Sequence, residues 1–195
     1  MKIKYRMKHP KRTFLDKYDN YKKYKQPLME DFNHRCGYCD AIDTWLGGSR
    51  FYHIDHFKPK SLFPHLETEY SNLVYSCPYC NIFKSNDWVE DEGAGYIDPC
   101  HEEYSNHFFR DRFGNIQPET KQGSFISKKL HLYLIRHSVL WNLARLEKLI
   151  VSIHELIETK KYEGEAIQRL KERHYVLTKE FFRYMGEFRK TQNSG

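Results

Sequence analysis

The sequence predicts an α+β module stapled by four cysteines and followed by a long antiparallel helical hairpin. Two Cys-x-x-Cys pairs, at residues 36–39 and 77–80, mark the module. Between and after them, a run rich in aromatic and branched residues (50–57) indicates a strand, and residues 81–89 indicate the start of a helix. Two apolar stripes with helical spacing then occupy residues 143–188.

The bulk composition is that of a polar chain that can bury one real core. It has 195 residues, a formal net charge of +6 and 16% aromatic residues. No window of about 18 apolar residues is present, so we expect no membrane span. The Lys-rich start is not followed by an apolar run, so a signal peptide is not expected. Four of the five cysteines lie in Cys-x-x-Cys pairs, which suits metal binding in the reducing cytoplasm better than two disulfides.

Charge is unevenly distributed along the chain. Residues 1–25 hold ten Lys or Arg and two acids, interleaved with Tyr and Phe. Such a segment can neutralise phosphates and stack on bases, or it can be a solvated and partly disordered arm. Residues 86–103 hold seven acids and no Lys or Arg, so we expect them to stay away from nucleic acid.

The module is predicted over residues 26–122. Pro27 suits the first turn of a short helix that leads to Cys36, and Gly37 is expected to permit the tight turn of the first cysteine pair. Residues 107–116 indicate a small hairpin that turns at Gly114 and Asn115. We therefore expect three parts: a basic arm (1–25), the module (26–122) and a helical region (123–195).

The helical region is predicted from its apolar spacing. One stripe runs through Leu143, Leu146, Ile150, Ile153 and Ile157, and residues 160–164 break it. A second stripe follows, and two such stripes predict an antiparallel hairpin whose helices pack on each other and on the module. Alternatively, part of the apolar surface binds a partner or a second copy of the chain.

The four paired cysteines predict a structural zinc site. Short gaps within the pairs and a long gap between them are typical of a closed tetrahedral four-thiolate centre, which has no open position for catalysis. We therefore expect Zn²⁺ to stabilise the module. The ligands would be Cys36, Cys39, Cys77 and Cys80.

The residues between the cysteine pairs suit hydrolysis of a phosphodiester. That reaction needs a base to deprotonate water and a cation to neutralise charge on the phosphate. His56 has the ordinary pKa of such a base, and Asp55 offers a hard oxygen to Mg²⁺. Asn81, directly after the second pair, adds a neutral oxygen. Lys84, one helical turn later, would face the same side and hold a phosphate.

This pattern resembles the HNH endonucleases. The sequence Asp55-His56, then Asn72, then Asn81, flanked by the cysteine pairs, fits that family in order and spacing over residues 36–85. The resemblance implies a ββα-metal fold and an endonuclease acting on nucleic acid, with DNA expected ahead of RNA. It implies His56 as general base, Asp55 and Asn81 as ligands of Mg²⁺ (or Mn²⁺), and Asn72 as a structural residue that holds the loop and the base through backbone hydrogen bonds.

Other residues near this motif are candidate phosphate contacts. His53 lies two residues before Asp55, so a regular strand would place both on one face. Lys58 and Lys60 lie beside the same loop and would suit phosphate contacts. Alternatively, they belong to a solvated loop. Cys100 is outside the pairs, and we interpret it as an inert or buried thiol.

A finer resemblance concerns a branch of the family. The segments HIDHFKPKS and EYSNLVYSCPYCNIFKS, then IDPC and a long helical region, are similar to the HNH proteins of Septu-type and retron-associated bacterial anti-phage systems. In those systems the nuclease works beside an ATPase of the ABC/SMC kind. The resemblance implies an antiviral effector whose helical region docks on that ATPase. The alternative is a non-catalytic zinc module that binds nucleic acid or protein, and the Asp55-His56-Asn81 set argues for catalysis.

Overall fold

The structure is a computed structural model that describes residues 1–6, 8–89 and 94–193. It divides into two compact units, Met1–His137 and Ser138–Gly195. We expected the helical region to begin at residue 123. Instead the first unit includes helix α3 (Lys121–Lys129), because this helix packs on strand β5 (Ile116–Pro118). Residues 90–93 of the acidic segment lie outside the described residues.

A two-stranded antiparallel sheet carries the Asp-His motif. Strand β2 (His53–His56) pairs with β3 (Leu73–Ser76), with Asp55 opposite Val74 and His56 opposite Leu73. The strand is shorter than the expected run of residues 50–57. The two preceding glycines have positive φ angles, and backbone hydrogen bonds from Phe51 and Tyr52 to Gly48 and Ser49 keep the chain in turns up to residue 52.

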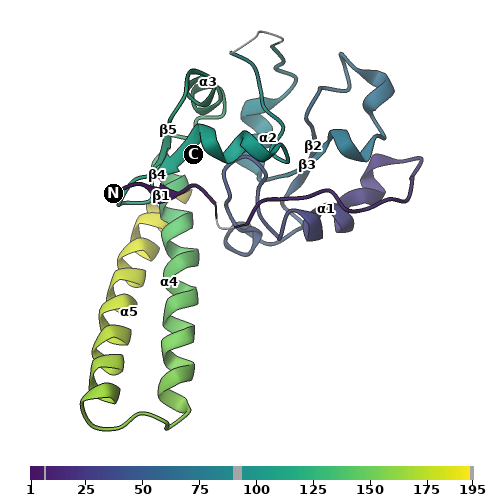
Figure 1. Cartoon of the computed structure of the whole chain (residues 1–195). Coiled ribbons are helices and arrows are strands. Elements are labelled where there is room, and N and C mark those ends of the chain that lie inside the picture. The colour runs from purple at the N-terminus through teal and green to yellow at the C-terminus, as the bar shows by residue number, and fades with distance from the viewer. Residues whose placement is uncertain (7, 90–93, 194–195) are drawn as a thin grey trace. The chain divides into compact units, whose positions relative to one another are not determined.

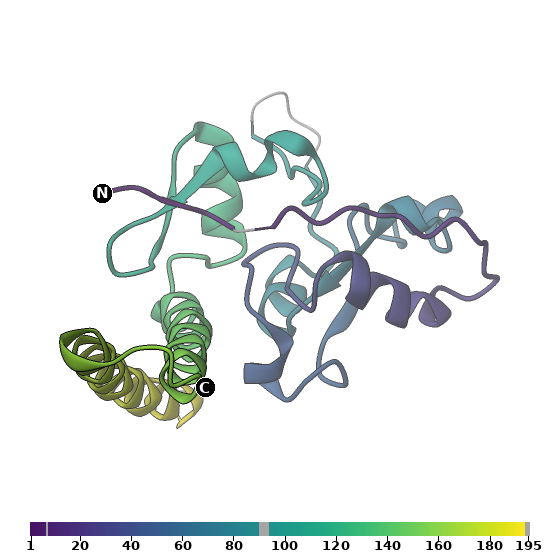
Figure 2. The ribbon, with the colours of Figure 1, turned by 60° about the horizontal axis from the view of Figure 1, so that its bottom comes forward.

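A second sheet includes the start of the chain. Its order is β1 (Ile3–Lys4), β4 (Phe108–Arg110) and β5, all antiparallel. Strands β4 and β5 form the hairpin expected near residues 107–116, and Gly114 in its turn has a φ of 86°. From this sheet the N-terminal segment crosses the first unit to helix α1 (Lys25–Asp31), as Figures 1 and 2 show. Part of the segment 1–25 is therefore paired and buried in the fold rather than solvated: Ile3 and Lys4 pair with β4, and Tyr5, Arg6 and Tyr24 are buried.

Helix α2 (Pro78–Lys84) begins within the second cysteine pair. Cys77 is its N-cap, and the Cys77 Sγ accepts a hydrogen bond from the Cys80 N–H at 3.4 Å. The expected helix over residues 81–89 was therefore misplaced. Pro78 suits the first turn, and Ser85, with a φ of 45°, ends the helix.

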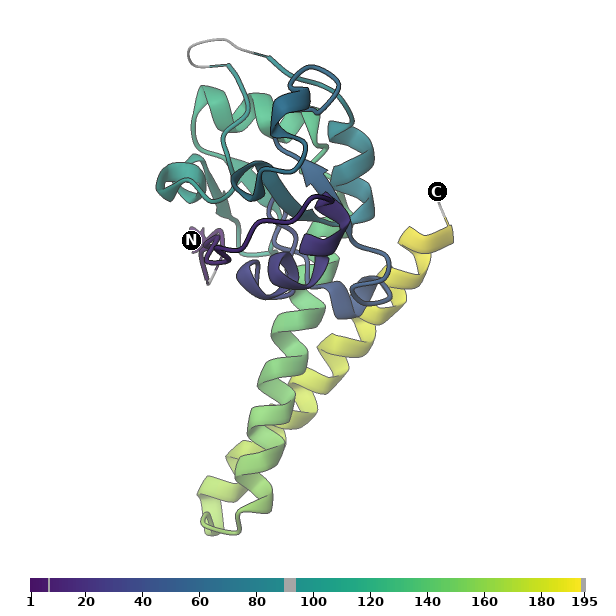
Figure 3. The ribbon, with the colours of Figure 1, turned by 90° about the vertical axis from the view of Figure 1, so that its right-hand side faces the viewer.

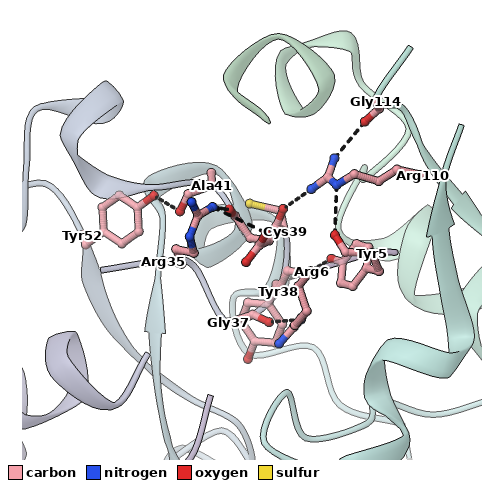
Figure 4. A network of polar contacts seen from close by, with 11 residues as sticks. Tyr5, Arg6, Arg35, Gly37, Tyr38, Cys39, Ala41, Tyr52, Arg110 and Gly114 are labelled. Atoms are coloured by element: carbon pink, nitrogen blue, oxygen red, sulfur yellow. Dashed lines mark hydrogen bonds and ion pairs between the residues drawn. The ribbon is translucent and has the colours of Figure 1, made fainter. Parts of the chain in front are cut away.

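The first cysteine pair is held by side chains from distant segments (Figure 4). Its consecutive backbone carbonyls accept hydrogen bonds from arginine and tyrosine side chains. The Gly37 carbonyl accepts from Arg6 at 2.7 Å, and the Cys39 carbonyl accepts from Arg110 at 2.9 Å. The Tyr38 carbonyl accepts from the hydroxyls of Tyr5 and Tyr104. Every one of these donors is buried.

Gly37 itself is required for a different reason from the one we expected. Its φ angle is not positive. A Cβ atom at this position would lie 2.7 Å from side-chain atoms of both Phe32 and Val74. Close packing behind the cysteine pair, rather than the turn conformation, therefore favours glycine here.

The second unit contains most of α4 (Ile135–Glu158) and all of α5 (Gly164–Asn193). The two helices run side by side (Figures 1 and 3), and the rings of His154 and His174 lie 5.8 Å apart. Leu143, Leu146 and Leu177 of the predicted stripes are buried. The two helices are separated between Glu158 and Gly164, at the break that the apolar stripes predicted. None of the helices in the described part of the chain combines the length and apolarity needed to cross a bilayer.

We predict that Arg110→Met destabilises the first unit by at least about 3 kcal/mol. The change removes hydrogen bonds to three carbonyls, and a buried acceptor without its partner costs roughly 1–3 kcal/mol. Those carbonyls belong to Tyr5, Cys39 and Gly114. Urea unfolding measures the effect. Arg169→Met, on the exposed surface of α5, is the matched control and should change stability by less than about 0.5 kcal/mol. Equal stability of the two variants would contradict the prediction.

Candidate active site

The four paired cysteines come together as predicted. Their sulfur atoms all lie within 4.8 Å of one another, and all four residues are buried. The Sγ atoms of Cys39 and Cys77 are 3.7 Å apart. Two sulfurs bound to one tetrahedral Zn²⁺ at about 2.3 Å are separated by roughly 3.8 Å. The donor set and its spacing therefore fit Zn²⁺.

The Asp-His motif and Asn81 line a common cavity. The end of β2 contributes Asp55 and His56, and α2 contributes Asn81 from its second turn. The cavity has a volume of about 460 Å³ and is open to solvent. The remaining lining residues come from the N-terminal segment, from β2 and the loop after it, and from α2 and the residues that follow it: Tyr21, Ile54, Pro59, Lys60, Ile82, Ser85 and Asn86.

His56 is held in one tautomer. Its Nε2 lies 2.9 Å from the backbone carbonyl oxygen of Glu67. A carbonyl only accepts hydrogen bonds, so the neutral imidazole carries its proton on Nε2 and keeps the lone pair on Nδ1. Burial lowers the pKa of His56, so the ring is neutral at pH 7. A neutral imidazole with a free Nδ1 lone pair can accept a proton.

Asp55 is a buried carboxylate with two partners. Its Oδ2 accepts a hydrogen bond from the Tyr38 hydroxyl at 2.5 Å, and the Lys84 ammonium lies 3.7 Å from the same atom. Burial raises the pKa of Asp55 to about 6, against the opposite effects of Lys84 and Tyr38. The carboxylate group is thus oriented by residues that belong to the first cysteine pair and to α2.

Asp55 and Asn81 offer the chemistry that a divalent cation requires. One carboxylate and one amide oxygen are hard ligands, and Mg²⁺ prefers few protein ligands beside water and phosphate oxygens. Both residues line the cavity. The pair fits Mg²⁺ or Mn²⁺ in donor type.

Asn72 ties together the loop that follows β2. Its Oδ1 accepts from the Lys58 N–H at 2.8 Å, and its Nδ2 donates to the Lys58 carbonyl at 3.0 Å. The Nδ2 also lies 3.3 Å from the Leu66 carbonyl, next to the residue whose backbone holds His56. The Asn72 side chain is therefore bonded to the loop after the candidate base at two points, Lys58 and Leu66.

Comparison with known proteins identifies this part of the chain. Residues 35–87, which contain every residue of the cavity motif and all four cysteines, match the family described as HNH endonuclease. Residues 35–87 form an HNH endonuclease domain. The chain is also similar to the Septu protein PtuB of Bacillus thuringiensis, with 33% identity over 84 residues. That match covers 43% of this chain and 31% of the relative. No solved structure matches the chain.

Lys84 does not have the role that the sequence suggested. We expected it to contact phosphate from the surface of the HNH domain. Its side chain is 0% exposed, and its ammonium donates to the His56 carbonyl at 3.0 Å and lies beside Asp55. Burial lowers the pKa of Lys84. Because its side chain is fully buried, the ammonium is not accessible to a substrate. It is a structural residue that braces the end of β2.

The other candidate phosphate contacts differ in their surroundings, and of these residues Lys60 lines the cavity. Lys60 lines the cavity, with a side chain 44% exposed and an ion pair of 2.7 Å to Glu67. The Lys58 ammonium lies over the rings of Phe63 and Trp88 instead. His53 is exposed on β2 and is not one of the cavity-lining residues, so the shared face with Asp55 did not bring it to the site.

The sequence interpretation missed three residues that contact the HNH motif. Tyr38 bonds Asp55, Glu67 holds His56 through its carbonyl, and Tyr21 packs on His56. A signal existed for Tyr38, because it lies inside the first cysteine pair and is therefore fixed by the metal site. Glu67 acts through its backbone, so its residue type carries no signal.

We predict that Cys77→Ser removes zinc and the cooperative unfolding of the HNH domain. Loss of one thiolate opens the tetrahedral centre, and structural zinc contributes folding free energy directly. Elemental analysis and a thermal melt measure both effects.

Cys100→Ser is the matched control. Cys100 is outside the cluster, and burial raises the pKa of its thiol to about 12, so it is inert at neutral pH. This variant should keep full zinc and a wild-type transition. Full zinc in Cys77→Ser would refute the assignment.

Proposed function

We propose that the protein is a metal-dependent endonuclease that hydrolyses phosphodiester bonds in nucleic acid. The observation that carries the proposal is the meeting of Asp55, His56 and Asn81 at one open cavity of an HNH domain. Binding alone needs no neutral imidazole beside two hard oxygen ligands. This combination is what hydrolysis by an activated water requires.

The residues divide the reaction between them. His56 accepts a proton from the attacking water at Nδ1, while the Glu67 carbonyl keeps Nε2 protonated. Asp55 and Asn81 would hold Mg²⁺ or Mn²⁺, and the chemistry such an ion supplies is neutralisation of charge on the phosphate and the leaving oxygen. Lys60, at the cavity, would contact a phosphate after exchanging its partner Glu67.

DNA is the substrate we propose ahead of RNA. Attack of water on phosphorus works on either backbone, and reading RNA would require a recognisable contact to the 2′-hydroxyl. The family resemblance is the reason for the preference. The assay below uses both nucleic acids because either can fit the open cavity.

The setting we propose is bacterial anti-phage defence in the cytoplasm. It rests on the similarity to the Septu protein PtuB and on the resemblance to Septu-type and retron-associated nucleases. In this setting the partner is an ATPase of the ABC/SMC kind. The helical unit is the proposed docking region, and large apolar side chains are exposed on it: Leu149, Val151, Leu156, Tyr175, Val176 and Phe182.

We predict that His56→Ala abolishes cleavage while zinc content and thermal stability stay at wild-type values. The alanine removes the base but no zinc ligand. Supercoiled plasmid and bulk tRNA, each with Mg²⁺, are incubated with wild type and variant. His65→Ala, an exposed histidine of the loop after β2, is the control and should cut like wild type.

The outcomes separate the nuclease from a non-catalytic zinc module. Cutting of one nucleic acid by the wild type and by His65→Ala identifies the substrate class. If nothing is cut, the assay is repeated with the ATPase partner. Continued absence of activity would refute the nuclease proposal and favour the non-catalytic zinc module. Equal cutting by His56→Ala would refute the assignment of His56 as the base.

A further inference from the structure

The ring of Tyr21 packs against the candidate base. The centroids of the Tyr21 and His56 rings are 4.8 Å apart, and the two planes are nearly perpendicular at 71°. This is the edge-to-face arrangement that aromatic rings prefer. Tyr21 also lines the cavity, although it lies outside the region that matches the HNH family.

Tyr21 is itself fixed by the segment that carries it. It opens a short 3-10 helix (Tyr21–Tyr24), which Asn20 caps by accepting from the Lys22 N–H at 2.9 Å. At the other end, Tyr24 is 1% exposed. Its ring lies 4.9–5.9 Å from three other aromatic rings, those of Phe14, Tyr18 and Tyr70. The position of Tyr21 is therefore set by an aromatic cluster around the buried Tyr24.

His56, Glu67, Lys60 and Tyr21 are joined in a ring by successive contacts. The Glu67 carbonyl holds Nε2, and the Glu67 carboxylate binds the Lys60 ammonium at 2.7 Å. That ammonium lies 4.7 Å from the centre of the Tyr21 ring. The Tyr21 ring in turn packs against the imidazole of His56. One hydrogen bond alone would leave the imidazole free to swing about its bond to the carbonyl, whereas a second contact on the ring restricts that motion.

We propose that Tyr21 is a positioning residue that, with the Glu67 carbonyl, fixes the imidazole of His56 for proton abstraction. The role of the fixed ring in cleavage rests on the proposed nuclease function. The fixing itself is a property of the protein without substrate. The proposal gives the aromatic N-terminal segment a function at the site. Its Tyr21 positions the catalytic base His56 and does not contact distant parts of the nucleic acid.

The test compares Tyr21→Leu with Tyr21→Phe. Tyr21→Phe keeps the ring and should behave like wild type. Tyr21→Leu should lower kcat about 10- to 100-fold, since small misplacements of a catalytic group have effects of this size, with KM changed by less than about twofold. Tyr133→Leu is the matched control: it removes an exposed tyrosine ring that lies outside both the aromatic cluster and the cavity, and its kcat should stay at wild type.

A second readout needs no activity. Correlation of ring protons with ring nitrogens by NMR, with the His56 signals assigned from their loss in His56→Ala, reports the tautomer and mobility of the ring. Wild type and Tyr21→Phe should show a single Nε2-protonated ring. Tyr21→Leu should show a mixture of tautomers or an Nε2 proton that exchanges faster with water.

The outcomes decide the inference independently of the nuclease proposal. Unchanged His56 signals in Tyr21→Leu, an equal loss of kcat in Tyr133→Leu, or a raised KM with unchanged kcat in Tyr21→Leu would overturn it. The last result would make Tyr21 a substrate-binding residue. If Tyr21→Leu does not fold, Tyr21→Met, of similar reach, takes its place. If no variant cleaves nucleic acid but the His56 signals change as expected, the positioning role stands and the nuclease proposal falls.

Discussion

The structure depends on satisfying the backbone of the first cysteine pair. Its consecutive carbonyls lie in the protein interior, where an unpaired acceptor costs roughly 1–3 kcal/mol. Arg6, Tyr104 and Arg110 supply the donors, each from a different part of the chain. Four thiolates around Zn²⁺ would carry two net negative charges, and the buried guanidinium groups of Arg6 and Arg110, which bond the backbone of the first cysteine pair, would offset part of that charge. The metal centre, the N-terminal strand and the β4–β5 hairpin thus stabilise one another.

The same cysteine pairs place both sides of the candidate site. Tyr38, between two zinc ligands, bonds Asp55 at the end of β2. The second pair starts α2, which carries Asn81 to the cavity and Lys84 under the His56 carbonyl. The candidate ligands for a divalent ion and the candidate base are therefore positioned by the segments that carry the four cysteines. This explains how a two-stranded sheet and a helix of two turns can present groups in fixed positions.

Residues whose identity carries their chemistry could be predicted from the sequence. The cysteine spacing indicated the cluster, and Asp55, His56 and Asn81 were identified from acid–base and ligand chemistry. The errors have physical causes. Lys84 was assigned to the surface by helical spacing, which does not show that α2 turns this side chain into the interior. The basic segment contained Tyr21, but only the packing of Tyr24, at the other end of the same short helix, on its aromatic neighbours brings the Tyr21 ring to His56. Glu67 contributes a carbonyl, which every residue has.

The pairing of Arg110 with Tyr5 also sets an order of events during synthesis. The two residues are 105 positions apart, so Tyr5 leaves the ribosome long before its partner exists. Contacts of such sequence separation form late, because the loop must close before they contribute. Until then the first cysteine pair has the donors from Tyr5 and Arg6 but lacks those from Tyr104 and Arg110. A ribosome stalled before residue 110 would hold a chain that contains the whole HNH motif and yet cannot complete its fold.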